Sequence, residues 1–161
     1  MDANATEFWS KCVLRDTDTL VAYALMKTKC RHRAADIVQD AFLSAIRSGA
    51  QPTNPRAYLM QAVRRRTAEL SRSKTEALLE THDVIDERID HSETLRDIWH
   101  VVAQLSPEFQ EVIMMRINGE FSFAEISEII GAPIGTVTSR YSRALAELRR
   151  KLQPEQANER S

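Results

Sequence analysis

The segment from Ser122 to Leu152 constrains the fold more than any other part of the chain, because it holds two helical patterns separated by a glycine. Ser122 and Glu125 have the spacing of a capping box, in which a hydroxyl and a carboxylate satisfy two backbone N–H groups at the start of a helix. Gly131 is placed to end that helix in the left-handed conformation, and Pro133 suits the start of the next one. The segment predicts two short helices joined by a tight turn.

The second of these predicted helices has two unlike faces. Apolar side chains recur at helical spacing within an arc of about 100°, namely Val137, Tyr141, Ala144, Leu145, Leu148 and Leu152. Ser139, Ser142, Arg143 and Arg150 project on roughly the opposite side. Two helices with hydroxyls and guanidinium groups on the free face of the second are typical of a DNA-binding helix-turn-helix. An ordinary helical hairpin with a solvated charged face gives the same pattern, so the rest of the chain has to decide.

The chain as a whole predicts an all-α protein. Apolar residues recur at spacings of three and four almost everywhere, and only 4 Gly and 5 Pro occur among 161 residues. No apolar run resembles a signal peptide or approaches the ~20 residues of a membrane span, so we expect a cytoplasmic protein without membrane insertion. Two cysteines, Cys12 and Cys30, are too few for a zinc ribbon or a disulfide framework. We expect free thiols and no bound metal or cofactor, and the sequence leaves a redox role for either thiol open.

Charge divides the chain into three segments, although its net charge is only −1. Residues 1–72 carry 12 basic and 7 acidic groups, residues 73–94 carry 2 and 7, and residues 95–161 carry 8 and 9. The middle segment also has few apolar residues, which is typical of a linker. The distribution predicts two small helical domains, 1–72 and 95–153, joined by an acidic linker at 73–94 and followed by a polar tail at 154–161.

The first domain is expected to contain several helices. A helical pattern runs from about Ala5 to Cys30, where Asp16 and Asp18 interrupt it and offer N-caps for a second helix. Residues 31–33 form a polar break before the next helical pattern, at residues 34–46. Gly, Asn and two prolines cluster at residues 48–55 and predict a loop.

A helix from about Pro55 to Arg72 is the most basic element in the chain. It holds five arginines, Arg56, Arg64, Arg65, Arg66 and Arg72. Such a density suits phosphate neutralisation, because each contact with a phosphate releases condensed counterions. A purely solvated basic helix is the alternative.

In the second domain, two helical patterns precede the segment at Ser122. The first contains Leu95, Ile98, Trp99, Val102 and Leu105. Ser106 and Pro107 then have the residue types of an N-cap and a first helical position. The apolar face of the helix that follows is predicted to consist of Phe109, Val112, Ile113 and Ile117, with Asn118 and Gly119 at its end.

Three parts of the chain, in this order, resemble the extracytoplasmic-function group of bacterial sigma-70-type transcription initiation factors. Residues 34–43 resemble region 2.2, and residues from 54 onward resemble regions 2.3 and 2.4. Residues 105–113, 119–126, 131–140 and 143–144 resemble region 4. A single GTVxSR motif would be weak evidence for this family, whereas the whole ordered set of matching segments, with the linker between them, is specific evidence. The resemblance implies an alternative sigma factor that binds core RNA polymerase and directs promoter-specific transcription initiation.

For the first domain, the resemblance implies contacts with polymerase and with the −10 element. In the family, the region 2.2 helix docks on a coiled coil of the largest polymerase subunit, and the corresponding positions are Asp36, Ile37, Gln39, Asp40 and Phe42. The loop at about residues 48–54 would hold a base flipped out of the −10 element. The residues expected to bind and open −10 DNA are Asn54, Arg56, Arg64, Arg65, Arg66 and Arg72.

For the second domain, the resemblance implies that the second helix of the helix-turn-helix lies in the major groove of the −35 element. The corresponding positions are Thr136, Thr138, Ser139, Arg140, Ser142 and Arg143. Arg143 is the expected base reader, because a guanidinium can bind guanine with two hydrogen bonds. Thr138 stands where the family often has Lys or Arg, which predicts a weaker salt dependence of −35 binding.

Other classes of protein account for less of the chain. A conventional helix-turn-helix repressor or activator leaves the first 72 residues and the acidic linker without a role. A sigma-like decoy that captures an anti-sigma factor usually carries a signalling domain, for which 161 residues are expected to leave no room. No metal set, nucleophile–base pair or phosphate loop stands out, so we do not expect an enzyme. The expected partners are core RNA polymerase and promoter DNA, and the sequence leaves open whether an anti-sigma factor also binds.

Overall fold

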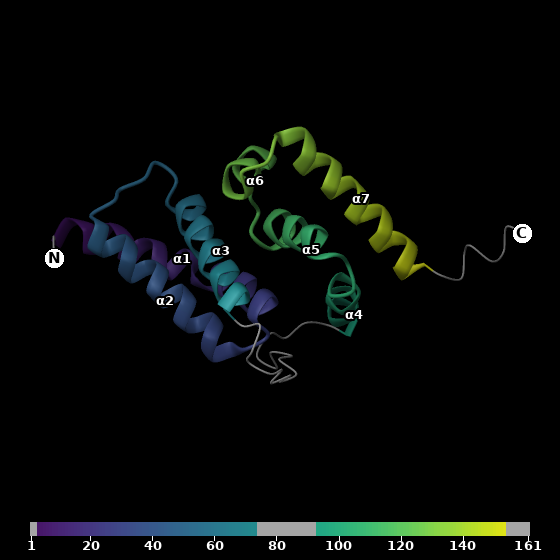
Figure 1. Cartoon of the computed structure of the whole chain (residues 1–161), viewed down its shortest axis with the longest axis horizontal. Helices are drawn as coiled ribbons and strands as arrows, with labels where there is room; N and C mark the ends of the chain where they lie inside the picture. Colours follow the sequence, from purple (N-terminus) through teal and green to yellow (C-terminus); the bar gives the residue numbers. More distant parts are fainter. Residues whose placement is uncertain (1–2, 74–92, 154–161) are drawn as a thin grey trace, which may run out of the picture. The chain divides into compact units, whose positions relative to one another are not determined.

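A computed structural model describes residues 3–73 and 93–153 of the chain, and all regular structure within these ranges is helical. The helices are, in order, α1 (Ala3–Thr28), α2 (Arg31–Ser48), α3 (Pro55–Ser73), α4 (Glu93–Val102), α5 (Pro107–Ile113), the π-helix η1 (Met114–Asn118), α6 (Phe123–Ile130) and α7 (Ile134–Leu152) (Figure 1). The all-α fold class is confirmed. No helix within the described ranges is long and apolar enough to cross a membrane.

The chain divides into two compact units, Met1–Ile85 (unit 1) and Asp86–Ser161 (unit 2), and their boundary lies outside the described residues. The predicted acidic linker and polar tail also lie almost entirely outside them. In unit 1, each of α1, α2 and α3 packs against the other two. Trp9 of α1 is fully buried, and its ring centroid lies 5.8 Å from that of Tyr58 in α3. Burial of such large side chains supplies the main stabilisation of a three-helix unit, about 1.5–3 kcal/mol for each.

A single helix, α1, replaces the two that the sequence predicts before Cys30. The chain stays helical past Asp16 and Asp18, so the prediction that they cap a second helix is wrong. Asp16 is instead buried, and its carboxylate accepts hydrogen bonds from Arg15 and, at 2.9 Å, from Nε of Arg56 in α3. The two guanidinium groups satisfy this buried carboxylate, so it does not have to accept hydrogen bonds from backbone N–H groups at a helix start. The polar break predicted at residues 31–33 is also wrong, because α2 begins at Arg31.

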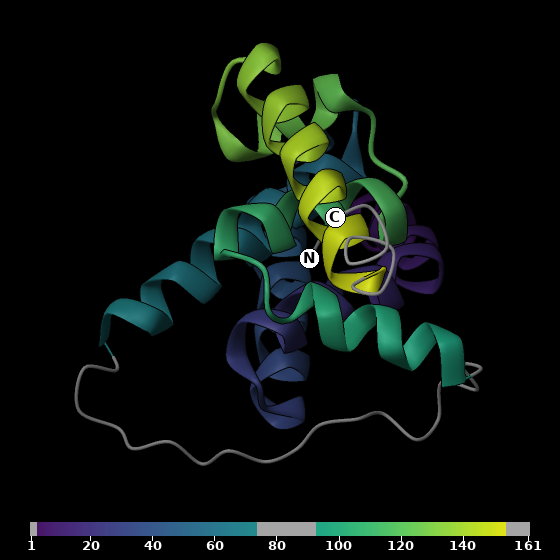
Figure 2. The same cartoon turned by 90° about the vertical axis from the view of Figure 1, so that its right-hand side faces the viewer.

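In unit 2, α4, α5 and α7 enclose one apolar cluster, which contains Val102, Leu105, Ile113, Ala144 and Leu148. Figure 2 shows α4 beside the C-terminal part of α7. Leu105 lies beyond the end of α4 but is still buried. The connection to α5 is held by the side chain of Gln110, which donates to the backbone oxygens of Ala103 and Leu105. The loop between α4 and α5 is therefore anchored to unit 2 by buried Leu105 and by Gln110, although its other residues are exposed.

The helix pair α6–α7 has the predicted form. The Ser122 N–H donates to the Glu125 carboxylate over 3.0 Å and the Glu125 N–H donates to the Ser122 hydroxyl over 3.1 Å, so the capping box is confirmed. Gly131 ends α6 in the left-handed conformation, with φ 75°. The Ser127 hydroxyl donates to the backbone oxygen of Ala132 across the turn. These local contacts fix where α7 begins.

The helix that starts at Pro107 changes pitch at Met114, where the π-helix η1 begins. The Gly119 N–H donates to the Met114 oxygen, five residues back, instead of the usual four. The wider turn changes which side chains face the core: Met115 is fully buried, whereas Ile117 is 49 % exposed. The prediction that Ile117 belongs to the apolar face is therefore wrong. Ser106 precedes α5 as expected, but its side chain makes no capping hydrogen bond.

Candidate nucleic-acid interface

The outer face of α7 carries the side chains that the sequence assigns to −35 DNA. Val137, Ala144 and Leu148 are buried on the opposite face, which leaves Ser139, Ser142 and Arg143 exposed. The other three predicted residues, Thr136, Thr138 and Arg140, are half-buried along the same helix. Hydroxyls and guanidinium groups on one side of a regular helix can donate hydrogen bonds to phosphates and to base edges.

Contacts between aromatic rings and an arginine hold α6 against its neighbours. The ring of Phe123, at the start of α6, lies edge-on to that of Tyr141 in α7, with 5.2 Å between centroids. On η1, Arg116 places its guanidinium carbon 4.5 Å from the Phe123 ring centroid and donates to the backbone oxygen of Phe121. These contacts join η1, α6 and α7, and so they fix the position of α7, whose outer face carries the predicted −35 residues.

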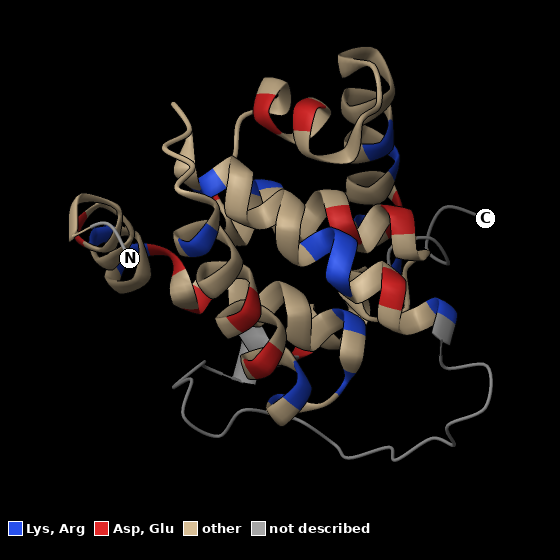
Figure 3. Cartoon of the chain, turned by 60° about the vertical axis from the view of Figure 1, so that its left-hand side comes forward, with Lys and Arg blue, Asp and Glu red and all other residues tan. Residues whose placement is uncertain are grey.

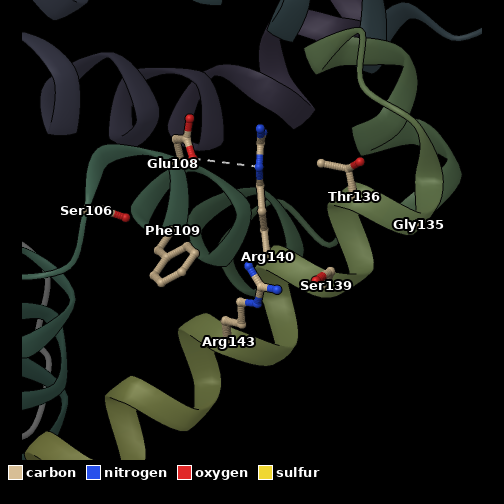
Figure 4. A pocket seen from close by; sticks show the side chains of 8 residues that line it. All are labelled: Ser106, Glu108, Phe109, Gly135, Thr136, Ser139, Arg140 and Arg143. Atoms are coloured by element: carbon tan, nitrogen blue, oxygen red, sulfur yellow. Dashed lines mark ion pairs between the residues drawn. The ribbon is translucent and has the colours of Figure 1, made fainter.

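An open groove runs between the start of α5 and the outer face of α7 (Figure 4). Its lining residues are Ser106, Glu108, Phe109, Gly135, Thr136, Ser139, Arg140 and Arg143. The structure thus brings together four of the six predicted −35 residues; Thr138 and Ser142 do not line the groove. Across it, Nε of Arg140 lies 3.8 Å from a carboxylate oxygen of Glu108. The sequence did not identify Glu108, because helical spacing alone gives no sign that the start of α5 lies beside α7.

In unit 1, two of the residues predicted to bind −10 DNA make contacts within the unit. Arg56 forms the ion pair with buried Asp16, and its own side chain is only 29 % exposed. Asn54 accepts a hydrogen bond from the Ala57 N–H over 3.1 Å and so caps the start of α3. These contacts tie α3 to α1 and fix the end of the loop before α3. Both residues therefore contribute to the framework of unit 1, and their contact with −10 DNA stays a prediction.

The remaining arginines of α3 differ in exposure. Arg65 and Arg72 are exposed, and Arg64 is half-buried. Arg66 reaches across to α2, where it donates to the Ser44 hydroxyl and lies 3.8 Å from the Asp40 carboxylate. Basic and acidic positions occur together on the helices of this unit (Figure 3). The basic helix is thus part of a mixed-charge surface.

The residues assigned to polymerase docking fall on two sides of α2. Ile37 and Phe42 are 5 % and 7 % exposed, so they pack inside unit 1 and cannot be part of a docking surface while the helix stays in place. Asp36, Gln39 and Asp40 are exposed on the other side. Leu43, which the sequence did not single out, is 37 % exposed on α2. Its spacing of three and four from Asp40 and Gln39 places it on the same face.

Neither cysteine is in a disulfide: Cys12 is buried in α1, and Cys30 is half-buried between α1 and α2. Burial raises the pKa of the Cys12 thiol, an effect that nearby Arg15 opposes and Asp16 reinforces. The part of the chain that the structure describes contains no group of three or more His, Cys, Asp or Glu side chains able to hold a metal ion.

Two sequence models of one family match the chain. The model of sigma-70 region 2 matches residues 13–76, and the model of sigma-70 region 4 matches residues 95–148. Together these matches cover most of the chain, and each falls in one of the two units.

Two curated relatives are themselves sigma factors. The ECF RNA polymerase sigma factor SigE of Mycolicibacterium smegmatis is 28 % identical over 92 % of this chain and 63 % of SigE. The RNA polymerase sigma factor HrpL of Pseudomonas syringae pv. syringae is 25 % identical over 84 % of this chain and 82 % of HrpL. The chain thus spans less than two thirds of the length of SigE.

Solved structures share the fold. The sigma factor RpoE of Bartonella quintana, in complex with the anti-sigma factor NepR, is 24 % identical with a TM-score of 0.76, over 91 % of this chain and 98 % of RpoE. CnrH, in complex with the cytosolic domain of CnrY, is 20 % identical with a TM-score of 0.66, over 91 % of this chain and 88 % of CnrH. From the matches to both regions and the SigE relative, the chain belongs to the sigma-70 family, in its extracytoplasmic-function group.

Proposed function

We propose that this protein is an alternative sigma factor that binds core RNA polymerase and directs it to promoters. The observation that carries the proposal is the helix-turn-helix of unit 2, whose second helix exposes Ser139, Ser142 and Arg143, in a chain whose other unit is sigma region 2. A repressor of the usual kind has no use for a region 2 unit. As a sigma factor it acts in the cytoplasm, where polymerase and promoter DNA are found, and it catalyses no reaction of its own.

In the proposed complex, α7 enters the major groove of the −35 element. Its 19 residues give it ample length, and its exposed face carries few apolar groups. Arg143 reads guanine through paired hydrogen bonds, and the hydroxyls of Thr138, Ser139 and Ser142 bind base edges or phosphates. Thr136, in the first turn of α7, lies where a helix start favours a phosphate. Arg140 completes the set of six.

Unit 1 binds the −10 element through the loop before α3 and the arginines of that helix. Both ends of the loop are fixed, by left-handed Gly49 with φ 67° at one end and by the Asn54 cap at the other. Extraction of a base from the stack requires a few kcal/mol, so a loop that is already ordered favours the opened strand. Arg64, Arg65, Arg66 and Arg72 would bind the backbone of that strand. Asn54 and Arg56 support this surface from within.

Polymerase docks on the outward face of α2. The exposed side chains Asp36, Gln39, Asp40 and Leu43 combine carboxylates with one apolar contact, as expected for a polar interface with a small apolar centre. Ile37 and Phe42 hold this face in place by packing beneath it.

The domain limits that go with this function are residues 1–72 for region 2, 73–94 for the acidic linker and 95–153 for region 4, with a tail at 154–161. A further partner is an anti-sigma factor, because the matched structures of RpoE and CnrH each contain a bound partner, which for RpoE is an anti-sigma factor. Such a protein would hold the chain inactive until a signal releases it.

Transcription in vitro tests the proposal. The full chain is mixed with purified core polymerase and genomic DNA, and specific run-off products are expected. Asp36→Arg is expected to abolish co-elution with core polymerase, because it reverses the charge on the proposed docking face. Asp18→Arg makes the same change at an exposed position of α1 and serves as the control. Failure of the wild-type chain to bind core polymerase would overturn the proposal.

A further inference from the structure

We infer that Glu108 is a positioning residue of the −35 surface. It restrains Arg140 and thereby weakens sequence-independent binding to DNA. The inference rests on the proposed function of α7. No other acidic side chain lines the groove between α5 and α7 within the described residues. A carboxylate on a surface that binds phosphates opposes binding, so its presence there needs a reason.

The geometry separates the two arginines of the groove. Arg140 and Arg143 are three residues apart on α7 and both line the groove (Figure 4). Glu108 approaches Arg140 to 3.8 Å, and the Arg140 side chain is 27 % exposed. Arg143 is exposed, and the figure shows its guanidinium on the side of the groove away from Glu108. One guanidinium is thus paired within the protein, while the other is presented to solvent.

This pairing has opposite effects on two kinds of binding. Sequence-independent affinity grows with the number of phosphates that the protein neutralises, and an arginine paired with Glu108 neutralises fewer of them. Sequence is read through contacts with base edges, for which we have proposed Arg143. An ion pair with a 67 % exposed carboxylate is weak, about 0–1 kcal/mol, so the restraint reduces general affinity without locking the surface. Glu108 thereby raises the ratio of specific to non-specific binding.

Salt dependence measures this restraint directly. The full chain is titrated with a mixed-sequence DNA duplex over a range of salt concentrations, with fluorescence anisotropy as the readout. Glu108→Gln is expected to raise affinity about two- to fivefold, the equivalent of a weak ion pair. It is also expected to steepen the slope of log K against log salt by about 0.9, because one more phosphate is neutralised. A purely structural role for Glu108 would change the unfolding midpoint and leave this slope unchanged.

Two controls separate positioning from general charge. Asp97→Asn removes one negative charge from an exposed position on α4, outside the groove, and is expected to leave the slope unchanged. In an Arg140→Gln background, Glu108→Gln is expected to leave the slope unchanged as well, because the arginine through which Glu108 acts is absent.

The inference is overturned by equal slopes for the wild type and Glu108→Gln, by a slope change that persists without Arg140, or by failure of the wild-type chain to bind the duplex at the lowest salt concentration. These outcomes are distinct from failure of the proposed function. Run-off transcription with core polymerase tests whether the chain is a sigma factor, whatever the role of Glu108.

Discussion

Units 1 and 2 both carry arginines on a helix that we assign to DNA, but they hold these arginines differently. In unit 1, Arg56 is paired with buried Asp16 and Arg66 with Asp40 on the neighbouring helix. In unit 2, Arg140 is restrained by exposed Glu108, and Arg143 is presented to solvent. The number of arginines in a sequence therefore overstates the number of cations available to DNA, and more so in unit 1.

The difference also concerns what each ion pair does for stability. Asp16 and Arg56 are 40 residues apart in sequence, and their pair joins α1 to α3. The carboxylate is 3 % exposed, so the pair is largely shielded from solvent. The pair between Arg140 and Glu108 is exposed to solvent on the Glu108 side and is therefore weak. Unit 1 thus uses an arginine of α3, the helix assigned to DNA, for its framework, whereas the framework arginine of unit 2, Arg116, lies on η1 and not on α7.

Asp16→Ala is expected to have the largest effect, because it leaves Arg56 without the buried carboxylate. The free energy of unfolding of unit 1 should fall by about 2–4 kcal/mol, somewhat below a fully buried pair because both arginines keep some exposure. Urea unfolding followed by Trp9 fluorescence, in a Trp99→Phe background, measures it. Glu7→Ala breaks an exposed pair with Lys11 and is the control. Equal losses for the two variants would remove the distinction between the units.

Arg143→Ala is expected to weaken binding to the −35 element by about 1–3 kcal/mol with little change in stability, because it removes the base-reading contact proposed for this exposed side chain. Arg56→Ala should do the reverse and act mainly on the stability of unit 1. Competition between promoter and mixed-sequence duplexes, with the chain in complex with core polymerase, measures the first effect. Arg150→Ala, on the same helix, is the control. Unchanged promoter discrimination in Arg143→Ala would contradict the assignment.

Gly49→Ala and Gly131→Ala should have similar effects in the two units, because each glycine ends a helix in the left-handed conformation. No atom lies within 4 Å of an added Cβ at either position, so the effect is one of backbone conformation. A loss of about 1–2 kcal/mol in the free energy of unfolding is expected for each. Gly135→Ala, in the first turn of α7 and also without close atoms, should instead be neutral or slightly stabilising. Separate urea midpoints from Trp9 and Trp99 test this; a loss confined to one unit would contradict it.

The smallest effect concerns pH and unit 1 alone. Because burial raises the pKa of Cys12, the folded chain keeps a proton that the unfolded chain releases at alkaline pH. The stabilisation is complete below the ordinary thiol pKa and is lost as the pH rises through the raised value. The urea midpoint of unit 1 should therefore fall at alkaline pH, and less so in Cys12→Ala. Cys30→Ala is the control, and an identical decline in both variants would count against the explanation.

The sequence predicted the helix-turn-helix almost completely, because its signals are local. The capping box joins residues three apart, and Gly131 acts on the helix that directly precedes it. The errors arose where a distant partner decides. Asp16 is a residue type that often caps helices, but its carboxylate binds Arg56 in another helix. Sequence spacing cannot reveal such a partner.

The candidate sites were predicted with the same limits. Periodicity placed Ser139, Ser142 and Arg143 on the free face of α7, where they are exposed. It could not show that Arg56 is paired with buried Asp16, nor that Glu108 lies beside Arg140. For Ile37 and Phe42, their own apolar character pointed to the core, where they lie, and only the resemblance assigned them to a surface. The DNA and polymerase contacts themselves stay predictions.

The π-helix η1 holds one residue more than a regular α-helix needs for the same rise, so this helix has a place where its length can change. Deletion of exposed Ile117 should convert the segment to an α-helix and leave the residues on both sides in register. A cooperative urea transition for unit 2 would support this, and an unfolded variant would contradict it. A larger side chain at the end of this segment is not tolerated equally well, because a Cβ at Gly119 would lie 2.7 Å from the Phe121 ring. The chain can therefore become shorter here more easily than it can become bulkier.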